Sequence, residues 1–143
     1  MINDGLKMTG AVAIALNGEV VQEIPNLVVT AGKNFVASRM KDTTKAAMTH
    51  MAIGTNNTTA AVGQTALSAE VTRGALTSTT VSTNTIAYVE TFAAGTGTGA
   101  IVEAGVFNAS SSGDMLCRTV FASGVVNKGS ADSMTITWTI TVS

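Results

Sequence analysis

The residues that could carry chemistry are few and scattered along the chain. His50 is the single histidine and Cys117 the single cysteine, so a nucleophile and base would have to combine His50 with Cys117 or with a serine. We expect the His50 ring on the polar face of a strand, and Cys117 as a buried, unreactive thiol at strand-like spacing. One histidine and one cysteine also cannot make a usual structural zinc set. The sequence therefore predicts no nucleophilic site and no metal.

A carboxylate pair of the kind used in glycoside hydrolysis could be sought among Glu70, Glu90 and Glu103. Single glutamates on strands are usually solvated, and we expect that for these three. The glycine-rich run at residues 95–99 is followed by a strand pattern, whereas phosphate-binding loops lead into a helix. We therefore predict that the protein is not an enzyme and needs no cofactor.

The only concentration of charge is cationic: Lys33, Arg39, Lys41 and Lys45 are interrupted by Asp42 alone. Cations near the end of a predicted helix are favoured by the helix dipole, so a solvated helix face is one interpretation. The other is a docking patch for an acidic protein surface, in which charge sets orientation more than affinity. Lys33, Arg39 and Lys41 are the candidate contact residues for such a partner.

The elements that would position these residues are mostly strands. Asn17-Gly18 between two alternating apolar runs is a strong hairpin signal. In residues 133–142, apolar side chains alternate with serine or threonine without exception, which predicts a half-buried strand with Trp138 in the core. A helix is predicted over Ala31–Met40, where Phe35, Val36, Arg39 and Met40 form a stripe. The predicted strands are residues 9–16, 19–24, 48–54, 72–81, 85–92, 100–107, 115–121 and 133–142.

This pattern predicts an all-β fold: an eight-stranded antiparallel sandwich of two sheets, of jelly-roll type, with one short inserted helix. The length of 143 residues and the apolar content of 45% predict one domain over residues 1–143. The longest apolar stretches are too short to span a bilayer, and the first residues lack the pattern of a signal peptide, so we expect a soluble chain made in a cytosol.

Charge is sparse, at 12% of residues with a net charge of −1. Such a chain has no field that would attract nucleic acid or an anionic membrane, so neither partner is predicted. Few charges also leave little to keep monomers apart. One face of the first predicted strand carries the small residues Ala11, Ala13 and Ala15, which allow close approach. We therefore predict a homo-oligomer, most simply a dimer.

From Ile53 to the C-terminus, an ordered series of segments resembles small structural proteins of tailed bacteriophages. The segments are Ile53-Gly-Thr55, Gln64-Thr-Ala-Leu67, Glu70-Val-Thr-Arg73, Phe92 to Ile101, Glu103-Ala-Gly-Val-Phe-Asn108, Met115 to Phe121, and Asn127-Lys-Gly to Trp138. The resemblance implies a jelly-roll cement or decoration protein that binds the major capsid protein on the outside of the assembled shell. Its place would be the virion, after synthesis in the host cytoplasm.

The alternative within this resemblance is a tail or fibre-associated module with a structural or receptor-binding role. Tail adhesins usually carry an elongated trimerisation segment, for which a sandwich of 143 residues leaves no room. The cement interpretation is therefore favoured.

Overall fold

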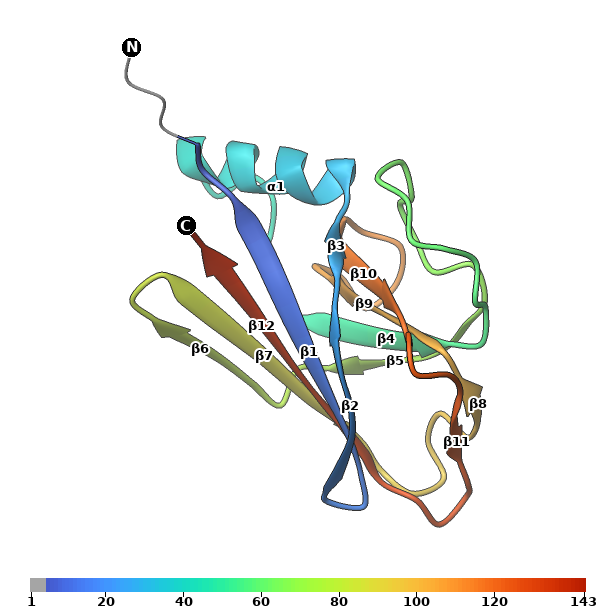
Figure 1. Cartoon of the computed structure of the whole chain (residues 1–143). Coiled ribbons are helices and arrows are strands. Elements are labelled where there is room, and N and C mark those ends of the chain that lie inside the picture. Colours follow the sequence, from blue (N-terminus) through green and yellow to red (C-terminus); the bar gives the residue numbers. More distant parts are fainter. Residues whose placement is uncertain (1–4) are drawn as a thin grey trace.

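A computed structural model describes residues 5–143, which form twelve strands and one helix (Figure 1). The helix α1 covers Thr30–Lys41. The strands are β1 (Met8–Leu16), β2 (Glu19–Pro25), β3 (Leu27–Val28), β4 (His50–Gly54), β5 (Glu70–Ala75), β6 (Ser78–Ser82), β7 (Thr85–Phe92), β8 (Gly99–Ile101), β9 (Glu103–Phe107), β10 (Met115–Val120), β11 (Val126–Lys128) and β12 (Met134–Val142).

Two five-stranded antiparallel sheets make up most of the fold. Sheet A has the strand order β2-β1-β12-β7-β6, sheet B has the order β3-β10-β9-β4-β5, and β8 pairs with β11 in a small third sheet. Figure 1 shows α1 lying across the upper end, above the strands of both sheets. The prediction of an all-β chain with two main antiparallel sheets and one short helix is confirmed.

Local sequence explains the centre of sheet A. Asn17 and Gly18 both have positive φ, 51° and 82°, which gives the tight turn between β1 and β2 that the Asn-Gly pair predicts. The alternating strand β12 lies between β1 and β7 and pairs with each over nearly its whole length. Its apolar side chains face sheet B, and Trp138 is fully buried, as predicted.

The predicted count of eight strands is wrong. The segment 72–81 divides at residues 76–77 into β5 of sheet B and β6 of sheet A, and the segment 100–107 divides at Val102 into β8 and β9. Alternating side chains indicate extended backbone, but they do not show where an extended chain leaves one sheet for another. The short strands β3 and β11 were also not predicted, because two or three residues show no period.

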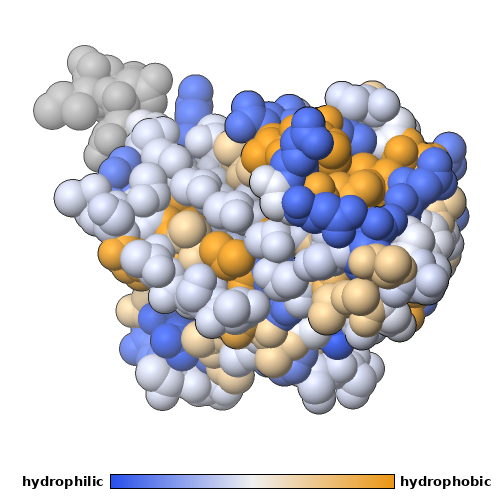
Figure 2. Space-filling model, turned by 90° about the horizontal axis from the view of Figure 1, so that it is seen from below, coloured by the Kyte–Doolittle hydropathy of each residue, from blue (hydrophilic) through white to orange (hydrophobic). Residues whose placement is uncertain are grey.

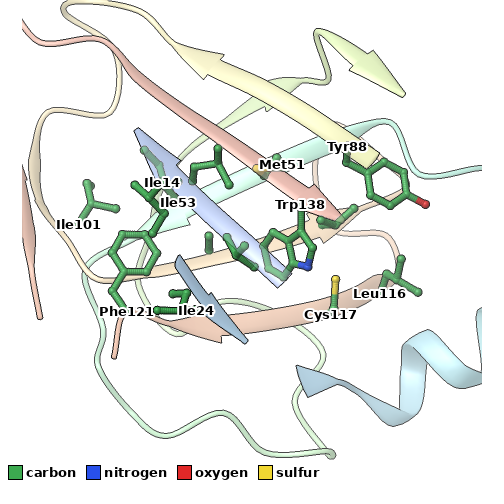
Figure 3. Packing of buried hydrophobic residues seen from close by; sticks show 14 of the residues in the cluster. Ile14, Ile24, Met51, Ile53, Tyr88, Ile101, Leu116, Cys117, Phe121 and Trp138 are labelled. Atoms are coloured by element: carbon green, nitrogen blue, oxygen red, sulfur yellow. The ribbon is translucent and has the colours of Figure 1, made fainter. Parts of the chain in front are cut away.

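The core lies between the two sheets. Figure 3 shows Trp138 of β12 beside Cys117 and Leu116 of β10, with Met51 of β4 nearby, so both sheets contribute to one cluster. Cys117 has no exposed surface, as predicted, and burial raises the pKa of its thiol well above the usual value. Its surroundings therefore keep it in the unreactive thiol form.

Candidate functional site

Helix α1 packs closely on sheet B through one narrow face. Phe35 and Gly32 are its buried residues, and a Cβ at position 32 would clash with the carbonyl oxygen of Leu116 in β10. Only glycine allows the helix backbone to approach the strand so closely. The predicted helix is confirmed, but the stripe is not: Met40, expected beside Phe35, is 80% exposed.

The three predicted contact residues are all exposed, but they do not form one patch. Residues two positions apart lie on nearly opposite sides of a helix, so Arg39 and Lys41 diverge. Arg39 Nη1 donates a hydrogen bond to the carbonyl oxygen of Lys45, 3.0 Å away, and Lys41 Nζ lies 3.3 Å from a carboxylate oxygen of Asp42. Lys33 alone of the three lines a cleft.

This cleft, of about 460 Å³, lies between α1 and the start of β1, and we call it the helix cleft. Its apolar lining includes Leu6, which is 73% exposed, and Met40. Lys7 and Lys33 are the charged residues that line it. The full lining is Leu6, Lys7, Met8, Thr9, Val28, Lys33, Val36, Ala37 and Met40.

The apolar lining extends toward the core. A smaller space of about 200 Å³ shares Leu6, Met8 and Val36 with the helix cleft and is lined further in by Tyr88 and Ile140. No sequence pattern predicted Leu6 or Met8 as part of this site. Leu6 precedes the alternating run, and no local pattern connects it with a helix that begins 24 residues later.

The opposite end of the sandwich also carries apolar surface. Val20, Val21 and Val125 are exposed there, beside a groove of about 410 Å³ that Val21 and Val125 line. Figure 2 shows this end from below, with an apolar area bordered by hydrophilic residues. Among the residues that the structure describes, no cation lines this groove, in contrast to the helix cleft.

Two of the candidate carboxylates are engaged in ion pairs. Glu103 is fully buried, and its Oε2 accepts hydrogen bonds from Arg118 Nη2 and Nε at 2.8 and 3.1 Å. Glu70 pairs with Arg73 at 2.7 Å, and the Arg73 guanidinium lies 3.7 Å from the centroid of the Phe107 ring. The expectation of a solvated glutamate is wrong for Glu103, which is buried against Arg118. Glu70 is exposed, as expected, and pairs with Arg73 at the surface.

The buried pair also holds a neighbouring loop in place. The 55–69 loop, which joins β4 to β5, donates three backbone N–H groups to Glu103: those of Asn56, Ser68 and Ala69. Arg118 donates to the carbonyl oxygens of Asn56 and Thr58 and to Oε1 of Gln64. Both charged groups thus use their hydrogen-bonding capacity to fix the loop. Their arrangement is that of a structural clamp.

Glu90 lies apart from the other two, on the inner face of sheet A. It is only 6% exposed, and its Oε2 has no hydrogen-bond partner within residues 5–143. Its carboxyl group lies over Gly74 of sheet B, where a Cβ would come within 3.0 Å of the carboxyl carbon. Burial raises the pKa of Glu90, and the backbone N–H of Thr91 and the side chain of Thr77 oppose that rise.

Glu90→Gln should therefore raise the free energy of unfolding at neutral pH. The expected gain is about 1 kcal/mol, the usual cost of burying a polar group without its full set of hydrogen bonds. A carboxyl whose pKa is raised in the folded state binds more protons when folded, so its destabilising effect sets in as the pH rises above the unfolded pKa. Urea denaturation at pH 7 and pH 4 tests this. The two proteins should differ at pH 7 and converge at pH 4, and a constant difference would contradict the assignment.

The remaining candidate groups do not come together in a catalytic or metal-binding arrangement. His50 is half-buried on β4, and its Nδ1 lies 2.8 Å from the hydroxyl of Thr49. In the part of the chain that the structure describes, no three His, Cys, Asp or Glu side chains gather as a metal ion would require. Likewise, α1 is the helix of residues 5–143, and it is neither long nor apolar enough to cross a bilayer.

Comparison of the chain with protein-family models, with curated proteins and with solved structures found no match.

Proposed function

We propose that the protein is a bacteriophage capsid cement, or decoration, protein that binds the outer surface of the assembled shell and stabilises it. The observation that carries the proposal is the helix cleft, where exposed Leu6 and Met40 adjoin Lys7 and Lys33. Exposed apolar surface bordered by charged residues is typical of a protein interface. The two packed sheets behind the helix cleft give this surface a rigid support.

The partner in this proposal is the major capsid protein, presenting an acidic and partly apolar outer face. The cations give the contact its orientation, and the apolar residues give it most of its affinity. The protein acts without catalysis or cofactor, on the virion, after synthesis in the host cytoplasm. The resemblance of the segments from Ile53 onward to phage structural proteins supports this assignment.

The jelly-roll type of fold belongs to the same proposal. The pairings β1 with β12, β3 with β10 and β4 with β9 are nested, and the first two lie in opposite sheets, which supports it. The consecutive pairs β1/β2, β4/β5, β6/β7 and β9/β10 each lie within one sheet and depart from the nested arrangement.

Reversing the charge at Lys33, Arg39 and Lys41 together, each to glutamate, should weaken attachment to isolated shells at low salt by up to about a hundredfold, enough to lose it at low protein concentration. One exposed ion pair contributes about 0 to 1 kcal/mol, so a single reversal should weaken binding by about fivefold or less. Lys33→Glu should have the largest single effect, because Lys33 lines the cleft. Co-sedimentation with shells measures attachment, and circular dichroism checks that the variant is folded.

A matched control carries three new glutamates at exposed loop positions, Thr98, Ser111 and Ser130, and should bind shells like the wild type. If the triple reversal binds as tightly as the wild type, the cations are a solvated helix face. If the wild type is found on tails and never on shells, the cement proposal fails and the tail or fibre-associated role replaces it.

A further inference from the structure

The two five-stranded sheets have four edge strands, and three of them carry features that discourage pairing with another chain. β2 has Glu19, Glu23 and Pro25, together with a register shift against β1. β3 is only two residues long, and β5 carries the Glu70–Arg73 ion pair. Charges, proline, bulges and short length are the usual ways in which proteins protect sheet edges.

The fourth edge, β6, has none of these features. All five of its residues are exposed, and residues 74–89 around it contain no charged residue and no proline. Val81 is 69% exposed. Figure 1 shows β6 at the outer side of sheet A, well away from α1. An exposed, uncharged edge of this kind is a template for a further strand.

The register of β6 with β7 shows which backbone groups are free. Ser82 and Thr85 flank the two-residue turn at Thr83-Asn84, so they form a hydrogen-bonded pair. Bonded and non-bonded pairs alternate along an antiparallel ladder. The N–H and C=O groups of Thr79 and Val81 therefore point away from β7, toward the open edge.

We propose that two copies of this chain pair through β6, antiparallel, about a two-fold axis at Thr80. The sequence Ser-Thr-Thr-Val-Ser of β6 is nearly palindromic, so the pairing places Ser78 opposite Ser82, Thr79 opposite Val81, and Thr80 opposite Thr80 of the second copy. In this register, Thr79 of one copy lies opposite Val81 of the other. The free backbone N–H and C=O groups of these two residues can therefore form hydrogen bonds across the interface. Sheet A then continues as ten strands, five from each copy.

A second copy fits this edge because a two-fold interface requires self-complementarity. Neutral residues bring no like charges together, and β-branched and hydroxyl side chains form favourable cross-strand pairs. The pairing also covers Val81 with Thr79 of the second copy on the same face of the sheet. The interface lies apart from the helix cleft, so it can be tested on the free protein whether or not capsid attachment holds.

The experiment is sedimentation velocity on the purified protein up to high micromolar concentration, with Thr80→Lys and Thr80→Glu. We expect the wild type to dimerise. Each variant places like charges opposite each other at the axis, so its dimer dissociation constant should rise at least tenfold. Mixing the two variants should restore a dimer, because lysine then lies opposite glutamate. That rescue also shows that both variants are folded.

Thr98→Lys, at an exposed loop position outside β6, is the matched control and should dimerise like the wild type. Ala11→Lys probes the small-residue face of β1 and should also leave the dimer intact. The proposal is overturned if the wild type remains a monomer, if Thr80→Lys dimerises normally, or if Ala11→Lys alone disrupts the dimer. A monomer that still binds shells would overturn the β6 pairing and leave the proposed function standing.

Discussion

Arg118→Met should lower the free energy of unfolding by about 3 to 5 kcal/mol, the usual cost of removing one partner from a buried ion pair. The guanidinium and the Glu103 carboxylate have no exposed side-chain surface and lie 2.8 Å apart. Methionine fills much of the same space but leaves the carboxylate without its counter-charge. It also leaves the carbonyl oxygens of Asn56 and Thr58 without a donor.

Chemical denaturation followed by circular dichroism measures this loss, and limited proteolysis reports on the loop. We expect new cleavage sites within the 55–69 loop, because Arg118 and Glu103 are what hold it. Lys41→Met removes a cation from an exposed pair with Asp42 and serves as the control, which should leave the stability nearly unchanged. An Arg118→Met protein as stable as this control would show that the clamp contributes nothing.

Removing both charges distinguishes the effect of the ion pair from the effect of its hydrogen bonds to the loop. Arg118→Met combined with Glu103→Leu leaves no unpaired charge, so the double variant should be more stable than the sum of the single effects predicts. The three backbone N–H groups of the loop that donate hydrogen bonds to Glu103 would still lose their acceptor. For that reason the double variant should not fully recover wild-type stability.

Trp138→Ala should cost a similar amount, about 3 to 5 kcal/mol, for a different reason: it opens a cavity between the two sheets. Trp138 is among the largest side chains with no exposed surface, and it packs against residues of β10 and β4 (Figure 3). Its Nε1 has no hydrogen-bond partner within residues 5–143. Trp138→Phe should therefore cost less than alanine, since it keeps an aromatic ring and loses no hydrogen bond.

Denaturation midpoints followed by circular dichroism give these differences. Thr139→Ala changes the neighbouring residue on the opposite face of β12 and should cost about 1 kcal/mol or less. Because Trp138 is the single tryptophan, the fluorescence of the folded wild type should be that of a buried indole. Emission like that of free indole in water, or a Trp138→Ala loss no larger than that of Thr139→Ala, would contradict the core placement.

The sequence predicted well those parts of the fold that depend on neighbouring residues. The Asn17-Gly18 turn, the helix and the alternating strand β12 all follow from local conformational preferences or from a period that repeats several times. Breaks at residues 76–77 and at Val102 could not be found in this way, because they depend on which sheet has room for the next strand.

The candidate site was predicted only in part, for the same reason. Lys33 was identified from charge, but the apolar side of its cleft comes from Leu6 and Met8, which the fold brings beside α1. Glu103 was classed with solvated glutamates, although Arg118 is 15 residues away and nothing local connects them. A lone arginine within an otherwise apolar strand was the available signal, since a buried arginine needs a carboxylate partner.

The position of β12 has a consequence for biosynthesis. β1 and β7 reach the ribosome exit well before β12, and each can pair early only with its hairpin partner, β2 or β6, because its other sheet A neighbour is β12. Until β12 emerges, the nascent chain holds two apolar strands without the partner that joins them, a state in which exposed edges favour misassembly. Closure of sheet A must therefore follow translation of this segment, and such distant pairing is slow, on a scale of about milliseconds to seconds.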